Sequence, residues 1–167
     1  MIYPATQPPG PAGGAAGGAA SLSSDHGFVS FVLAGERLGI PVERVQEVLN
    51  PQAISPVPLA PDAVAGFLNL RGQIVTALDL RARLGLPARD GAQRSMNVVV
   101  RDRDELFSLL VDEVGDVVEP AGRAVEPTPP TLAPEWRACA LGVLRLEEHL
   151  LVVLDVDALL RGEAAGA

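Results

Sequence analysis

The stretch that decides the fold is GFLNLRGQIVTALDLRARL (Gly66–Leu84), because it returns late in the chain as GVLRLEEHLLVVLDVDALL (Gly142–Leu160). Each copy holds two short apolar runs around a polar turn, followed by an Asp and a further apolar segment. A second pair of blocks precedes these, ERLGIPVERVQEVLNP (Glu36–Pro51) and ELFSLLVDEVGDVVEP (Glu105–Pro120). Because both blocks occur in the same order in each half, the sequence predicts an internal duplication.

Short apolar runs separated by turn signals predict an all-β fold with about ten strands. Two short helical turns are expected, at Leu80–Leu84 and Val156–Leu160. Asp79 and Asp155 precede them in N-cap position, and a glycine lies near the end of each. The expected strands are Phe28–Leu33, Arg37–Ile40, Val45–Leu49, Gly66–Leu70, Ile74–Asp79, Met96–Arg101, Leu106–Val111, Val114–Val118, Cys139–Leu146 and Leu150–Asp155.

Five short strands in each half would leave exposed edges if the sheet stayed open, so we expect two five-stranded barrels packed on each other. The folded part should cover residues 28–160, with barrel halves at roughly 28–90 and 91–160. Residues 1–27 are rich in Gly, Pro and Ala and have little to bury, which predicts a disordered tail. Residues 161–167 are expected to form a short C-terminal tail.

The charge and composition of the 167 residues exclude several classes of protein. A formal net charge of -8 disfavours a nucleic-acid-binding protein, because phosphate binding needs clustered cations. The apolar runs are too short for a membrane span, and the N-terminus lacks the features of a signal peptide. A single cysteine, Cys139, cannot form an internal disulfide. We therefore expect a soluble cytoplasmic protein without membrane insertion.

The sequence does not predict an enzyme. Its two histidines, His26 and His149, have no evident nucleophile or orienting acid beside them. Cys139 lacks a histidine partner and is expected to be a small buried residue. No Cys or His cluster has metal-ligand spacing, and no phosphate-binding loop is present. We expect no catalytic residue, no metal and no cofactor.

The two halves differ in charge at one equivalent turn. Asn69-Leu70-Arg71-Gly72 predicts a tight turn that projects Arg71 outward, whereas Glu147 and Glu148 occupy the equivalent place in the second half. Packing gives no reason for this reversal, so it hints at function. Glu47 could form a structural ion pair with Arg71 from a neighbouring strand, or both could face a partner.

The sequence resembles the CheW family of chemotaxis coupling proteins from about Phe28 to Leu160. The resemblance is carried by FVSFVLAGERLGIPVERVQEVL, GFLNLRGQIVTALDLRARLG, LLVDEVGDVVEP and ALGVLRLEEHLLVVLDVDALL, in family order. It implies two intertwined five-stranded SH3-like barrels. Two departures are Thr76, where the family often has proline, and the EEH turn, where it has a glycine-containing one.

The resemblance also implies a non-catalytic adaptor. Such proteins link the cytoplasmic tip of a chemoreceptor to the regulatory domain of a CheA-type histidine kinase. They contact this kinase domain through apolar strand surfaces. Gly142 fits a position where the family needs a small residue. The positions implied for partner contact are Val45, Glu47, Gly66, Arg71, Val114, Val117 and Gly142.

A small-ligand-binding double barrel without protein partners is the alternative. An apolar cavity between the barrels would favour it, whereas an exposed apolar strand patch would favour the adaptor.

Overall fold

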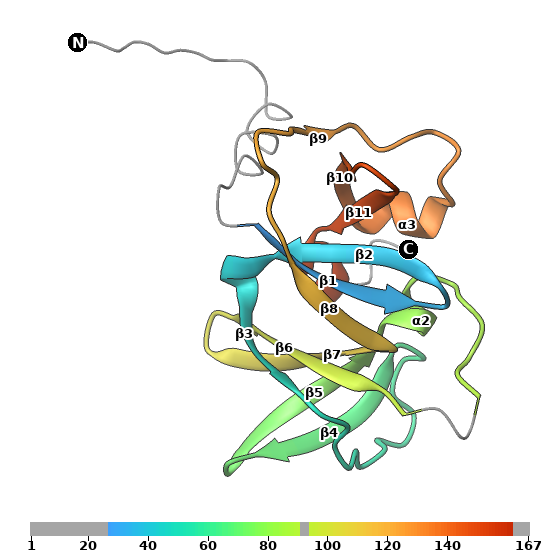
Figure 1. Cartoon of the computed structure of the whole chain (residues 1–167). Coiled ribbons are helices and arrows are strands. Elements are labelled where there is room, and N and C mark those ends of the chain that lie inside the picture. Colours follow the sequence, from blue (N-terminus) through green and yellow to red (C-terminus); the bar gives the residue numbers. More distant parts are fainter. Residues whose placement is uncertain (1–26, 91–93, 162–167) are drawn as a thin grey trace.

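The computed structural model describes residues 27–90 and 94–161, and within them the chain forms two β-sheets with few short helices. The tails predicted for residues 1–27 and 161–167 fall almost wholly outside these ranges, as does His26. Figure 1 shows the six-stranded sheet in the upper part of the view and the five-stranded sheet below it. The prediction of an all-β protein with two β units is confirmed.

The six-stranded sheet has the order β8-β1-β2-β11-β10-β9, and the five-stranded sheet has the order β3-β6-β7-β5-β4. The upper sheet consists of β1 (Phe28–Leu33), β2 (Glu36–Pro41), β8 (Glu113–Val118), β9 (Val125–Glu126), β10 (Ala140–Arg145) and β11 (Leu150–Leu154). The lower sheet consists of β3 (Val45–Leu49), β4 (Val64–Leu70), β5 (Gln73–Asp79), β6 (Met96–Asp102) and β7 (Glu105–Val111).

The strand pairing confirms the internal duplication. When each strand of the lower sheet is replaced by its copy in the other half of the sequence, the order becomes β8-β1-β2-β11-β10, the order of the upper sheet. The registers agree as well. Leu38 pairs with Val152 in the parallel β2–β11 ladder, and their aligned counterparts Phe107 and Thr76 pair in the parallel β7–β5 ladder.

The division of the chain into barrel halves at 28–90 and 91–160 is wrong, because the two halves exchange strands. The β1–β2 hairpin of the first half pairs with β8 and β11 of the second. The β6–β7 hairpin of the second half pairs with β3 and β5 of the first. Each sheet therefore consists of strands from both halves, and neither is encoded by one repeat.

Both predicted helical turns begin at their capping residues, and the described residues contain two further helical elements. α2 (Leu80–Arg83) starts where the Asp79 carboxylate accepts a hydrogen bond from the Arg81 amide, and α4 (Val156–Arg161) starts at Asp155 in the same way. A 3-10 turn, η2 (Val42–Arg44), connects β2 to β3. Neither α3 (Pro134–Cys139) nor the two-residue strand β9 was predicted; β9 makes the upper sheet six-stranded instead of five-stranded.

The largest hydrophobic core fills the space between the sheets. It joins Phe31 and Leu38 of the upper sheet to Val98 and Leu109 of the lower sheet, and Trp136 of α3 packs against it. Two smaller clusters lie within the individual sheets. The two sheets are therefore held together as one body by shared apolar burial. Apolar side chains occupy the space between them, where the small-ligand alternative expects a cavity.

Candidate functional site: two matched surface regions

The β4–β5 turn has the geometry predicted for Arg71 and Gly72. Their φ angles are 51° and 87°, so both residues adopt the left-handed conformation of a tight hairpin turn. The Asn69 side-chain oxygen accepts a hydrogen bond from the Gly72 amide at 2.8 Å and fixes the turn. The Arg71 side chain is 70% exposed, so the turn presents a cation to solvent as expected.

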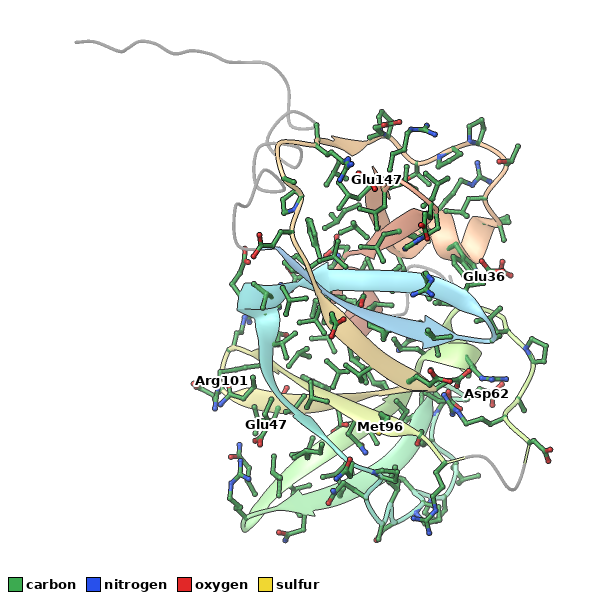
Figure 2. The ribbon with its side chains drawn as sticks, viewed as in Figure 1. Glu36, Glu47, Asp62, Met96, Arg101 and Glu147 are labelled. Carbon is green, nitrogen blue, oxygen red and sulfur yellow. The ribbon has the colours of Figure 1, made fainter. Side chains whose placement is uncertain are left out.

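Arg71 and Glu47 form an ion pair through a hydrogen bond from Arg71 Nη2 to Glu47 Oε2. They were expected on neighbouring strands, but the pair joins the β4–β5 turn to β3, and β3 and β4 are the opposite edges of the lower sheet. The sheet therefore curls until its edges meet. A bridge between Ser55, which follows β3, and Phe67 of β4 closes it further. Figure 2 labels Glu47 at the end of the lower sheet near Arg101.

The equivalent corner of the upper sheet reverses the charge at one of its two positions and keeps it at the other. Asp116 and Glu147 stand where the lower sheet has Glu47 and Arg71. Glu147 lies 3.7 Å from Arg123, and Arg145 pairs with Glu126 at 3.2 Å. The Arg145 hydrogen bond lowers the pKa of Glu126. The reversal seen in the sequence therefore distinguishes the two ends of the molecule, with Glu147 far from Glu47 (Figure 2).

The three valines among the expected contact residues differ in exposure. Val45 and Val114 occupy equivalent positions at the starts of β3 and β8, and both pack against the central core. Val117 of β8 is 50% exposed. Of the three, Val117 is the one with a large area available to a partner.

Gly66 and Gly142 are equivalent glycines that allow close backbone contacts. Each lies at a bulge in its hairpin. A Cβ atom at Gly66 would lie 2.1 Å from the Ser55 carbonyl oxygen, and one at Gly142 would lie 2.2 Å from the Glu126 carbonyl oxygen. Both residues are buried. This explains physically why the sequence needs a small residue at each place, while a direct partner contact there stays a prediction.

Exposed apolar side chains occupy matched positions on the two sheets. Ile74 and its counterpart Leu150 are 60% and 42% exposed, and Val48 and its counterpart Val117 are 41% and 50% exposed. Phe67, 40% exposed, adds to the lower sheet and lines with Ile74 an open recess of about 370 Å³. Phe67, Ile74 and Leu150 were not singled out in the sequence. The signal that could have found them is the alternation of their strands, in which they fall opposite the buried positions.

Among the described residues, Cys139 and His149 are the reactive side chains that the sequence singles out. Cys139 is buried as predicted, and burial raises the pKa of its thiol. His149 lies exposed in the β10–β11 turn. In these described ranges, no group of three or more His, Cys, Asp or Glu side chains could hold a metal ion, and no helix is long and apolar enough to cross a membrane. What the arrangement offers is two surfaces for binding.

Comparison with known proteins places this architecture in a family. Residues 27–164 match the family model of the CheW-like domain, and the chain belongs to this family. "Chemotaxis protein CheW" of Klebsiella aerogenes is 30% identical over 139 residues, covering 81% of this chain and 82% of that protein. "Chemotaxis protein CheW" of Rhizobium meliloti is 29% identical over 136 residues, covering 81% and 88%.

A solved structure agrees with the fold. The crystal structure of "scaffolding protein TtCheW" from Thermoanaerobacter tengcongensis is similar with a TM-score of 0.67 and 27% sequence identity. The similarity covers 79% of this chain and 90% of that one. The resemblance read from the sequence motifs is therefore confirmed at the level of family and fold.

Proposed function

We propose that this chain is a non-catalytic chemotaxis adaptor that couples the cytoplasmic tip of a chemoreceptor to the regulatory domain of a CheA-type histidine kinase. The observation that carries the proposal is the pair of matched apolar surfaces on one rigid body. The names of its relatives, chemotaxis protein and scaffolding protein, support it. The protein would act in the cytoplasm, at receptor arrays beneath the membrane.

Two surfaces on one body suit a bridging protein. Exposed valine, isoleucine and phenylalanine side chains gain free energy when a partner covers them, at about 25 cal/mol for each Å² of apolar surface. Because the shared core fixes the two sheets relative to each other, partners that touch residues of both sheets are held in a defined geometry. The adaptor then changes the output of the kinase by placing it, without chemistry of its own.

Receptor contact is assigned to the positions that the family resemblance implies. Glu47, Arg71 and Val117 are the members with exposed side-chain surface, so they would touch the receptor directly. The Arg71–Glu47 charges would fix the register of the receptor helices more than the affinity. The remaining members shape the strands that carry these side chains: Val45, Gly66, Val114 and Gly142.

Kinase contact is assigned to the apolar strand surfaces. Phe67 and Ile74 on the lower sheet, and Leu150 on the upper sheet, are exposed and lie outside the set given to the receptor. A regulatory domain built as a similar double barrel would offer apolar strands of its own to cover them.

The first test compares two arginines in equivalent settings. Arg71 and Arg103 are both exposed, both lie in hairpin turns, and their φ angles are 51° and 58°. Arg71→Ala should weaken binding of a receptor signalling fragment about tenfold, or ~1.4 kcal/mol, in isothermal titration calorimetry. Arg103→Ala should leave this affinity unchanged.

The stability of the same variants separates binding from folding. An exposed ion pair contributes about 0–1 kcal/mol, so Arg71→Ala should keep the circular dichroism spectrum of the wild type. Loss of the folded state would mean that the Arg71–Glu47 pair is structural. If the wild-type protein bound neither the receptor fragment nor the kinase regulatory domain, the adaptor proposal would fail.

The kinase assignment is tested by the matched pair Ile74→Ser and Leu150→Ser, one on each sheet. Both side chains are substantially exposed, so the fold should tolerate either change. At least one variant should bind the kinase regulatory domain more weakly while receptor binding is kept. Wild-type kinase affinity in both variants would remove these strand surfaces from the proposed interface.

A further inference from the structure

The chain crosses between the two sheets at two equivalent places. The first crossover is η2, which leads from β2 in the upper sheet to β3 in the lower sheet. The second is Asp112, which leads from β7 in the lower sheet to β8 in the upper sheet. β3 and β8 are the two edge strands that carry Glu47 and Val117. Each of these strands therefore begins at a crossover (Figure 1).

Each crossover is tied by an Arg–Asp ion pair to a helix of the sheet that the chain has just left. Arg44 of η2 donates to Asp157 of α4 at 3.0 Å, and α4 follows β11 of the upper sheet. Asp112 accepts from Arg81 of α2 at 2.5 Å and 3.1 Å, and α2 follows β5 of the lower sheet. Arg81 and Asp157 occupy equivalent positions of the two repeats, so the polarity of the pair is reversed between them.

The second crossover is anchored in a buried network. Besides the two bonds from Arg81, Asp112 accepts from Arg89 Nε at 2.9 Å and from the Ala34 amide at 2.8 Å. The side chains of Arg81, Arg89 and Asp112 are only 9%, 11% and 8% exposed. Arg81 also donates to the Pro87 carbonyl oxygen. A buried charge with this many partners is costly to release.

The ion pair of the first crossover is far more exposed. The Arg44 and Asp157 side chains are 29% and 50% exposed, and one hydrogen bond joins them. Water and salt screen such a pair, whose contribution is at most about 1 kcal/mol. The two ion pairs are thus at equivalent crossovers but differ in burial and in the number of hydrogen bonds.

We propose that the Arg44–Asp157 pair is a releasable latch that positions β3, whereas Asp112 with Arg81 and Arg89 is a fixed anchor for β8. Release of the latch lets the start of β3 move relative to α4 while the central core keeps both sheets folded. β3 and β8 are both edge strands in equivalent positions, and the ion pairs at their crossovers differ in burial and in the number of hydrogen bonds.

Amide hydrogen exchange measured strand by strand tests this proposal without any partner. Arg44→Ala should speed exchange of the β3 amides about threefold and leave the β8 amides unchanged. Asp157→Asn, which removes the acidic partner of Arg44, should speed exchange of the β3 amides to the same extent. Arg37→Ala removes an exposed arginine from β2 and serves as the control, with wild-type exchange in both strands.

Salt supplies a second, independent measurement. Raising the salt concentration from about 0.05 M to about 0.5 M should speed β3 exchange in the wild type and have little effect on β8. In Arg44→Ala this salt dependence of β3 should be smaller, and what remains belongs to the exposed Glu47–Arg71 pair of the same strand. Unchanged β3 exchange in Arg44→Ala, or an equal response of β3 and β8 to salt, would overturn the proposal.

A third measurement, hydrogen exchange with a bound receptor fragment, rests on the proposed function. If the receptor contacts Glu47 on β3, a bound receptor fragment should slow β3 exchange and remove the difference between wild type and Arg44→Ala. If the difference between the free proteins is found but the receptor fragment has no effect on β3, the latch stands and the receptor assignment fails. If the free proteins do not differ, the latch fails whatever the receptor does.

Discussion

The absence of a side chain at Gly66 allows the lower sheet to close. The backbone after β3 returns to β4 at Ser55, and the Ser55 carbonyl oxygen occupies the place that a Cβ at Gly66 would need. At Gly142 the Glu126 carbonyl oxygen of β9 does the same. Two glycines aligned by the duplication thus allow the same close approach, which explains why both repeats keep this residue in the block that defines them.

Gly66→Ala should destabilise the protein by at least about 3 kcal/mol, because the backbone of β4 or of Ser55 must move. The matched control is Gly72→Ala, which has a φ of 87° but no atom within 4 Å of the added Cβ, and should cost about 1 kcal/mol. Urea unfolding followed by the fluorescence of Trp136, the single tryptophan, measures both. Equal costs would show that φ alone matters at Gly66.

Asp112 predicts a specific pH dependence of stability. Burial alone would raise the pKa of Asp112, but hydrogen bonds from Arg81, the Ala34 amide and Arg89 outweigh it and lower the pKa. A carboxyl whose pKa is lower in the native state stabilises the fold above its unfolded pKa of about 3.9. That stabilisation is lost as the pH falls through the lower native value.

Asp112→Asn should therefore cost about 3 kcal/mol at neutral pH, because two buried arginines lose their anion. The difference in unfolding free energy between wild type and variant should shrink below about pH 4. Asp157→Asn, in the exposed pair, should cost less than about 1 kcal/mol. A wild-type to Asp112→Asn difference that stays constant across this pH range would contradict the assignment of the effect to Asp112.

At the scale of elements, the sequence predicted what depends on local pattern. All ten expected strands are present with boundaries within two residues, and both Asp-capped helices begin where the capping signal lies. β9 was missed because a strand of two residues has no periodicity. α3 was missed because PEWRAC offers no side-chain N-cap and is too short for a helical repeat of apolar residues.

The candidate site was predictable in part, because part of its geometry also depends on local sequence pattern. The turn conformation of Arg71 and Gly72 follows from local residue preferences, so its geometry was foreseen. The partner of Arg71 was not placed correctly, because Glu47 reaches it only when opposite edges of the sheet meet. The exposed faces of Phe67, Ile74 and Leu150 depend on which side of each strand the core covers, which a single strand does not specify.

At the scale of the whole molecule, the residues showed the duplication, whereas the exchange of hairpins was indicated only by the intertwined barrels that the family resemblance implies. Two similar half-sequences are compatible both with two separate barrels and with two barrels that exchange strands. In either arrangement each strand has the same kind of neighbouring strand. The exchange places β1–β2 and β6–β7 in the opposite units and fills the space between them with one core. This makes the two halves of the sequence depend on each other.

Fragments 1–90 and 91–167 should accordingly not fold alone. Separation breaks the β1–β8, β2–β11, β3–β6 and β5–β7 ladders, whereas the hairpins left inside each fragment are marginal in water. Mixing the fragments should restore the β-sheet circular dichroism, the buried-tryptophan fluorescence of Trp136 and a complex with the mass of the whole protein in size-exclusion chromatography. Independent folding of fragment 1–90 as a monomer would show that the exchanged strands are not what holds the two repeats together.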